Sequence, residues 1–137
     1  MNEALKEAYK AAEKDEVPIG AVIVSGNKII ARGHNLTETL TDVTAHAEMQ
    51  AITAASGFLG GKYLDGCTLY VTIEPCIMCA GALAWSQIGK IVFGSSDEKR
   101  GYELLGKPVL HPATLVERGI LAGEWSVLQE FFRKKRD

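Results

Sequence analysis

The sequence lacks several features that would place it in a specialised class of protein. Its three cysteines are too few for a disulfide-rich secreted scaffold, and two of them form a Cys-x-x-Cys pair that suits metal binding in a reducing compartment. No apolar run approaches the roughly 20 residues needed to span a bilayer. The first residues lack the basic start and apolar stretch of a signal peptide. We therefore expect a cytoplasmic protein with no membrane partner.

A strong net charge and internal repeats are also missing. The 15 basic and 17 acidic residues give a net charge of -2, which argues against nonspecific coating of nucleic acid but allows a local basic patch. No composition shift marks a linker. The chain of 137 residues, 47% of them hydrophobic, can bury one continuous core. We predict a single domain over residues 1–137.

The sequence does contain an alternation of helical and strand patterns. Residues 25–27 join two β-rich runs as an antiparallel hairpin, and the strand-helix-strand order over 67–93 favours a right-handed parallel crossover. An α/β fold is expected, a three-layer α-β-α sandwich around a mixed five-stranded sheet. The patterns predict helices over 3–14, 44–56, 75–85 and 123–135, a short helix near 98–105, and strands over 19–24, 28–32, 67–73, 90–93 and 114–117.

Two short motifs carry the chemistry, His46-Ala47-Glu48 and Pro75-Cys76-Ile77-Met78-Cys79. One imidazole and two thiolates are three zinc ligands, and zinc with three protein ligands keeps its fourth tetrahedral position for water. H-x-E followed by P-C-x-x-C is the established signature of zinc-dependent nucleobase deaminases. The chemistry indicated is hydrolytic: Glu48 would take a proton from the water and return protons to a ring nitrogen and a departing amine.

The spacing within each motif makes a geometric prediction. Cys76 and Cys79 stand three apart, so on a helix both sulfurs lie on one face, where the positive helix N-terminus favours thiolates. Residues two apart on a regular helix point in nearly opposite directions, so His46 and Glu48 could not face one metal. We therefore predict that the second helix starts irregularly at His46.

Three stretches of the chain resemble the tRNA-specific adenosine deaminases of bacteria: Glu16 to Val22, Thr44 to Glu48 and Leu69 to Ala82. The resemblance covers almost the whole chain. It implies a cytidine deaminase-like fold, a homodimer with one zinc ion per subunit, no organic cofactor, and conversion of the wobble adenosine of a tRNA anticodon loop to inosine. It also implies that His46, Cys76 and Cys79 are the zinc ligands and that Glu48 is the proton shuttle.

The resemblance further assigns contacts with the substrate. Asn35 would hydrogen-bond the flipped base, and the backbone N–H of Ala47 would touch the purine. The RNA contacts that it implies are Asp97, Lys99, Phe132 and Arg136. The chain departs from the bacterial family at residues 102–112, a shortened stretch in the region that shapes the substrate mouth of this fold.

Two other functions stay open at this point. A deaminase of a free base or nucleoside, such as guanine, cytosine or cytidine, needs the same zinc and glutamate but no basic surface. A noncatalytic zinc-stabilised module would usually close its site with four protein ligands and has no use for Glu48.

Several residues that could carry chemistry have ordinary structural explanations. Cys67 is expected in the core, and His34 and His111 on the surface or in loops. Trp85 and Trp125 suit core or dimer packing better than base stacking. The cations at 133–136 fit a solvated helix end as well as an RNA contact.

Overall fold

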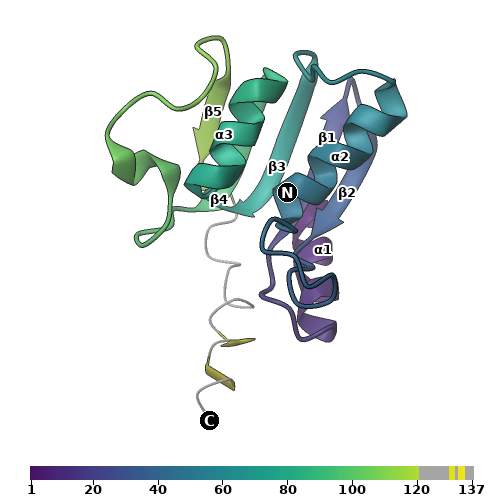
Figure 1. Cartoon of the computed structure of the whole chain (residues 1–137), viewed down its shortest axis with the longest axis vertical. Helices are drawn as coiled ribbons and strands as arrows, with labels where there is room; N and C mark the ends of the chain where they lie inside the picture. The colour runs from purple at the N-terminus through teal and green to yellow at the C-terminus, as the bar shows by residue number, and fades with distance from the viewer. Residues whose placement is uncertain (121–129, 132, 135–137) are drawn as a thin grey trace.

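The computed structural model of the protein describes residues 1–120, 130, 131, 133 and 134. Five strands form one sheet in the order β2-β1-β3-β4-β5, in which β1 is antiparallel to β2 and β3, while β3, β4 and β5 are parallel (Figure 1). The predicted mixed five-stranded sheet is confirmed. In chain order the elements are α1 (Asn2–Glu13), β1 (Gly20–Ser25), β2 (Lys28–His34), α2 (Ala47–Leu59), β3 (Cys67–Ile73), α3 (Ile77–Ser86), β4 (Lys90–Ser95), the 3-10 turn η1 (Tyr102–Leu105) and β5 (Leu115–Arg118).

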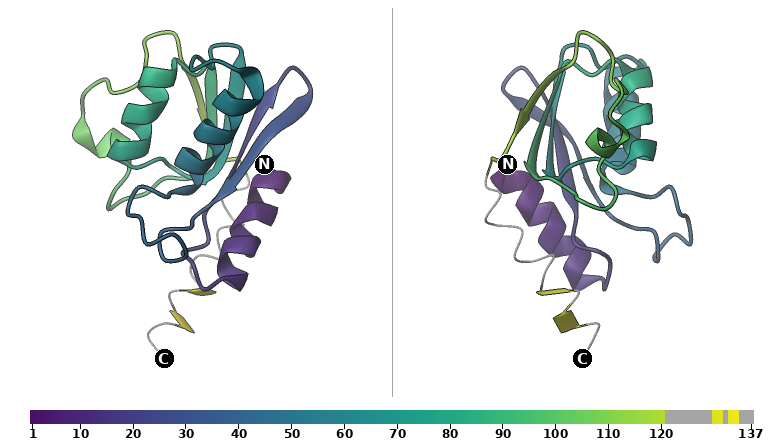
Figure 2. Two further views of the ribbon diagram at one scale, coloured as in Figure 1. Left: turned by 45° about the vertical axis from the view of Figure 1, so that its right-hand side comes forward. Right: turned by 90° about the vertical axis from the view of Figure 1, so that its left-hand side faces the viewer.

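Helices cover both faces of the sheet, as the predicted three-layer sandwich requires. Figure 2 shows α1 on one face, with α2 and α3 together on the other. Each face has one strand glycine against a helix backbone. A Cβ on Gly20 would collide with α1 at Ala4, and one on Gly33 would lie 2.5 Å from the carbonyl oxygen of Ala47 in α2. The absence of a side chain at these two positions therefore lets α1 and α2 pack close to the sheet.

The core lies between the sheet and the pair α2 and α3. The central strand β4 is buried on both faces over residues 91–94, as predicted, whereas β3 is fully buried only over 71–73 and has Thr68 and Tyr70 half-buried on one face. The helices meet them with small residues, which brings the helix axes close to the sheet and to each other. Fully buried core residues include Ala51, Ala55, Leu69, Val71, Ala80, Leu83, Ile91 and Phe93.

Three predicted helix boundaries are wrong. The second helix begins at Ala47 and not at residue 44. It does not end before Gly57 but continues to Leu59, and Gly60 ends it in the left-handed conformation with φ 70°. An interior glycine costs a helix about 1 kcal/mol relative to alanine, which does not end the helix here, and the N–H groups of Gly60 and Gly61 close its last turn on the Ser56 carbonyl at 2.9 and 3.2 Å. The third helix begins at Ile77 and not at Pro75, because the Pro75 carbonyl accepts the Tyr102 N–H and Cys76 pairs with Gly101 in a β-bridge.

The region after β4 contains little regular structure. The short helix expected near 98–105 is the single 3-10 turn η1, and the last predicted strand is present as β5. The closing helix predicted over 123–135, with Trp125, Phe132 and Arg136, falls mainly outside the described residues. No helix in the described part of the chain is long and apolar enough to cross a membrane.

Candidate active site

The starts of α2 and α3 meet at one edge of the sheet, and the predicted ligand residues sit at these starts. His46 is the N-cap of α2 with φ -73° and ψ 158°, an extended conformation outside the helix. The predicted irregular start is thus confirmed, and Glu48 lies in the first turn of the helix. Cys76 is likewise the extended N-cap of α3, and Cys79 lies in its first turn. The two helix termini therefore present their unpaired N–H groups beside these side chains.

The structure brings His46, Cys76 and Cys79 together. The His46 Nδ1 atom lies 3.6 Å from the Cys76 sulfur and 3.5 Å from the Cys79 sulfur. All three donor atoms lie within 4.8 Å of one another. Tetrahedral zinc with a Zn–S bond of about 2.3 Å and a Zn–N bond of about 2.05 Å separates nitrogen from sulfur by about 3.6 Å. The donor set and its spacing therefore fit a zinc ion.

The three groups influence one another's protonation. A hydrogen bond with Cys79 is the main cause that lowers the pKa of Cys76 to about 4; burial opposes it and His46 assists it. The same contact, together with burial, raises the pKa of Cys79, while the hydrogen bond with Cys76 raises the pKa of His46. The cluster thus already holds one sulfur as a thiolate, the form that binds zinc.

Glu48 is the acid of this site. Its side chain is buried, with only 3% of the residue exposed. Burial, with a smaller contribution from the nearby Cys76, raises the pKa of Glu48 to about 7, against the opposing effect of the α2 backbone and of His46. A carboxyl group with a pKa near neutrality both accepts and releases protons at physiological pH, which is what general acid–base catalysis requires.

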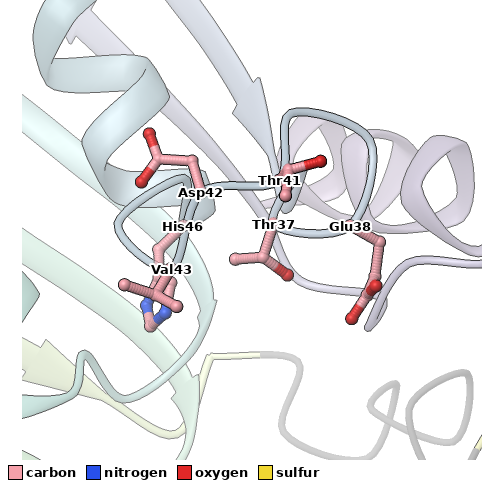
Figure 3. A pocket seen from close by; sticks show the side chains of 6 residues that line it. All are labelled: Thr37, Glu38, Thr41, Asp42, Val43 and His46. Carbon is pink, nitrogen blue, oxygen red and sulfur yellow. The ribbon is translucent and has the colours of Figure 1, made fainter.

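A pocket of about 460 Å³ opens beside His46. Its wall is the loop between β2 and α2, residues 35–45, which the Leu36 N–H to Ala45 carbonyl bond of 2.9 Å closes at its base. Among the described residues that line the pocket none is Lys or Arg, so the pocket suits an uncharged ring better than a phosphate. The lining residues, labelled in Figure 3, are Thr37, Glu38, Thr41, Asp42, Val43 and His46.

Two of the substrate contacts expected from the sequence lie close to this pocket in the chain. Asn35 is buried, and its Oδ1 accepts the Thr37 N–H at 3.2 Å, so it shapes the start of the loop as a turn residue does. Ala47 is the first residue of α2 and is completely buried, and its neighbours in the sequence are His46 and Glu48.

Asp97 and Lys99 belong to a second loop, residues 96–101, after β4. The Asp97 carboxylate accepts the N–H groups of Lys99 and Arg100, each at 3.0 Å. The bridge between Cys76 and Gly101 places this loop beside the cysteine motif. Phe132 and Arg136, the other two expected contacts, lie outside the described residues.

Two buried glutamates, to which no role was assigned from the sequence, hold these loops. Glu16 accepts the N–H groups of Glu38 and Thr39, and Glu74 accepts those of Asp97 and Glu103. The available signal was an acidic residue set in an apolar surrounding, since Glu16 precedes Val-Pro-Ile and Glu74 follows the buried run of β3. Such a residue is costly to bury unless it is hydrogen-bonded.

Some of the residues for which the sequence suggested an ordinary structural role lie where they were expected, and others do not. Cys67 is buried at the start of β3, as expected of a core residue. The core alternative for Trp85 is wrong, because this side chain is 85% exposed. His34 is not an exposed loop residue: it ends β2, half-buried, with Nδ1 3.0 Å from Glu7 Oε1. His111, by contrast, lies in a loop as expected.

Comparisons with known proteins show the family of this chain. Residues 1–136 match the family of MafB19-like deaminases. A tRNA-specific adenosine deaminase of Aquifex aeolicus is 48% identical over 98% of this chain and 92% of its own length. A solved structure from work on A-to-I editing by tRNA:A34 deaminases is 43% identical over 96% of both chains, with a TM-score of 0.85.

A guanine deaminase of Bacillus subtilis is more distant. It is 30% identical over 96% of this chain and 90% of its own, with a TM-score of 0.68. The higher identity, at nearly full length, is to the proteins named for adenosine in tRNA. The chain belongs to the MafB19-like deaminases and, within them, to the family of tRNA-specific adenosine deaminases.

Proposed function

We propose that this protein is a zinc-dependent hydrolase that converts adenosine to inosine at the wobble position of a tRNA anticodon loop. The observation that carries the proposal is the group of His46, Cys76 and Cys79, which has zinc spacing and lies beside both a buried glutamate and an open pocket. A tRNA-modifying enzyme also suits the cytoplasmic location expected from the sequence. We treat residues 1–137 as one catalytic domain.

His46 through Nδ1, and Cys76 and Cys79 through their sulfurs, would hold the zinc ion. Bound there, zinc would acidify a water molecule so that it can act as the nucleophile near neutral pH. The chain's own contribution to binding is to fix three ligands on two helix starts, and no further Cys, His, Asp or Glu of the described residues joins the cluster, so a bound zinc ion would keep one position for water.

Glu48 would move the protons of the reaction. It takes one proton as water adds to C6 of the adenine ring and delivers it to N1, and it then takes the remaining hydroxyl proton of the C6 adduct and delivers it to the exocyclic amine. The C6–N bond then breaks, ammonia leaves, and C6 keeps the oxygen as the carbonyl of inosine. The burial of Glu48 excludes bulk water from this transfer.

The flipped base and the phosphates of the RNA would be bound by two different regions of the protein. The pocket, with neutral and acidic lining, would take the flipped base, positioned by Asn35 and the Ala47 N–H. Phosphate contacts would come from the loop with Asp97 and Lys99 and from the C-terminal Phe132 and Arg136. A loop base is already unstacked, so flipping it costs little.

We also propose that the protein is a homodimer. Large apolar side chains are exposed on α3 and on the adjoining turn η1, a surface more typical of an interface than of a monomer. Sedimentation of the purified protein would measure the assembly directly. The exposed residues of this surface are Ile77, Trp85, Leu104 and Leu105, with 51%, 85%, 59% and 54% exposure.

The deciding experiment compares substrates. Purified protein with measured zinc content is incubated with an anticodon stem-loop that carries adenosine at the wobble position, and with free adenosine, guanine, cytosine and cytidine. We expect inosine only in the RNA, at a rate that falls steeply with salt because phosphates are bound. Ammonia release from a free base, without salt dependence, would instead establish the free-base deaminase.

A further inference from the structure

Glu16 is a buried carboxylate that the proposed mechanism does not use. It follows the turn after α1 and precedes β1, and none of its surface is exposed. Its own N–H is bonded to the Ala11 carbonyl at 2.9 Å, so the backbone of α1 fixes its position. A carboxylate is buried at high cost unless it is hydrogen-bonded, so its partners show what the residue is there to hold.

Those partners all belong to one short segment of the loop between β2 and α2. One carboxylate oxygen accepts the Glu38 N–H at 3.1 Å, and the other accepts the Thr39 N–H at 2.6 Å and the Thr39 hydroxyl at 2.7 Å. Hydrogen bonds to an ionised acceptor are about twice as strong as neutral ones. Glu16 therefore ties a segment 22 and 23 residues further along the chain to the body of the domain.

This segment is part of the pocket wall. Glu38 lines the pocket directly, and Thr37 and Thr41 line it on either side of the tied residues, while His46 at the far end of the same loop faces the same space (Figure 3). The Asp42 N–H bonds the Thr37 carbonyl at 3.0 Å, so a shift at Glu38 and Thr39 is passed to the rest of the wall. Among the described residues, the hydrogen bonds of the Glu16 carboxylate go to Glu38 and Thr39 and not to Cys76 or Cys79, the two cysteines proposed to bind zinc.

We propose that Glu16 is a positioning residue for substrate recognition. It holds the loop at the distance from His46 that defines the width of the pocket, and it does so without touching the substrate. The proposal rests on the proposed function in one respect, that the pocket receives the base. Loss of the Glu16 carboxylate should weaken binding of the substrate. It should leave the chemical step, which belongs to Glu48 and the cysteine cluster, nearly unchanged.

The test is the variant Glu16→Gln, which keeps the size of the side chain and replaces one acceptor oxygen by a donor that faces N–H groups. With the anticodon stem-loop we expect KM to rise about tenfold and kcat to change by less than about twofold. Zinc content should stay at the wild-type value. Amide hydrogen exchange should become faster at residues 36–42, which reports the loop independently of turnover.

The matched control is Glu7→Gln. Glu7 is also a buried glutamate, bonded to Lys10 at 2.7 Å and to His34 at 3.0 Å, but it lies on α1 away from the pocket. This variant should lower the melting temperature and leave KM unchanged. Thr39→Val is a milder variant that removes one donor, so it should raise KM less than Glu16→Gln, and the double variant should resemble Glu16→Gln alone.

Each outcome decides the proposal. An unchanged KM in folded Glu16→Gln, or a loss of kcat together with zinc, overturns it. If Glu16→Gln does not fold, Thr39→Val decides in the same way, by its KM. A wild-type protein that forms no inosine counts against the proposed function alone. In that case hydrogen exchange decides, and wild-type protection of residues 36–42 in Glu16→Gln overturns the role of Glu16.

Discussion

Two loops border the cluster of His46, Cys76 and Cys79, and one buried glutamate holds each of them. Residues 35–45 are tied to Glu16, and the second loop, residues 96–101, is tied together with η1 to Glu74, in both cases through backbone N–H groups. The difference lies in what else the glutamate is connected to. Glu16 comes from the turn after α1 and is bonded to Glu38 and Thr39, whereas Glu74 is separated from Cys76 only by Pro75.

The two buried glutamates therefore hold their loops in the same way but should affect different steps, substrate binding for Glu16 and metal binding for Glu74. The loop held by Glu16 leads into His46, but the bond between the Leu36 N–H and the Ala45 carbonyl closes it at its base, so its displacement should affect the binding of the substrate more than the metal centre. The loop held by Glu74 is paired with Cys76 itself through the β-bridge to Gly101, so its displacement should disturb the metal centre as well. Substitutions at these glutamates and at residues near them test whether the two loops differ in this way.

The largest effect is expected at Glu48, which belongs to neither loop. Its substitution should lower kcat without a change in metal binding. Glu48→Ala should lower kcat by roughly 10²- to 10⁴-fold, because the proton transfers lose their carrier, and should keep zinc and fold. Kinetics on the stem-loop and metal analysis would measure both. Full activity of this variant would refute the mechanism, and loss of zinc would make Glu48 a part of the metal site.

The next effect is expected at Glu74. Glu74→Gln removes an acceptor for the N–H groups of Asp97 and Glu103, which are bonded at 3.0 and 2.9 Å. A residue that orients a metal ligand typically contributes roughly 10- to 100-fold to metal affinity or activity. We therefore expect lower zinc occupancy and lower kcat, measured by titration with a chelator. A change in KM alone would erase the distinction between the two loops.

A pH experiment tests the ionised state of Glu16. Burial raises the pKa of Glu16, but the hydrogen bonds of Thr39 and Glu38 lower it more, so its pKa lies below the usual value of 4.5. A depressed pKa in the folded state stabilises the protein above pH 4.5, and this stabilisation is lost as the pH falls through the folded-state pKa. The melting temperatures of the wild type and Glu16→Gln should therefore differ most near neutrality and converge in acid. A gap that is independent of pH would contradict a charged Glu16.

The smallest effect is expected at Lys99, an exposed cation of the second loop. Lys99→Ala removes at most one phosphate contact, so KM for the stem-loop should rise only about two- to fivefold, and the salt dependence of log KM should weaken by about 0.7. Titration with salt at fixed pH measures the slope. An unchanged slope would assign the phosphate contacts to other residues.

Much of the fold followed from local patterns. The apolar runs at 67–73 and 90–93 predicted β3 and the core of β4, and the alternation of helices and strands predicted the mixed sheet. The boundaries of α2 and α3 were missed for different reasons. Gly57 was expected to end α2, but the helix continues through it and stops where Gly60 adopts the left-handed conformation. Tertiary contacts of Pro75 and Cys76 with residues 101 and 102 delay the start of α3.

The sequence by itself determined the ligand types, their spacing and the acid at Glu48, because these are properties of side chains that stand close together along the chain. It also determined that His46 must lie outside the regular helix, from the geometry of residues two apart. Only the tertiary structure decided how Glu16 and Glu74 place the two loops. Their partners are backbone N–H groups 22 to 29 residues away, and a backbone N–H group is the same in almost every residue, so it leaves no mark in the sequence.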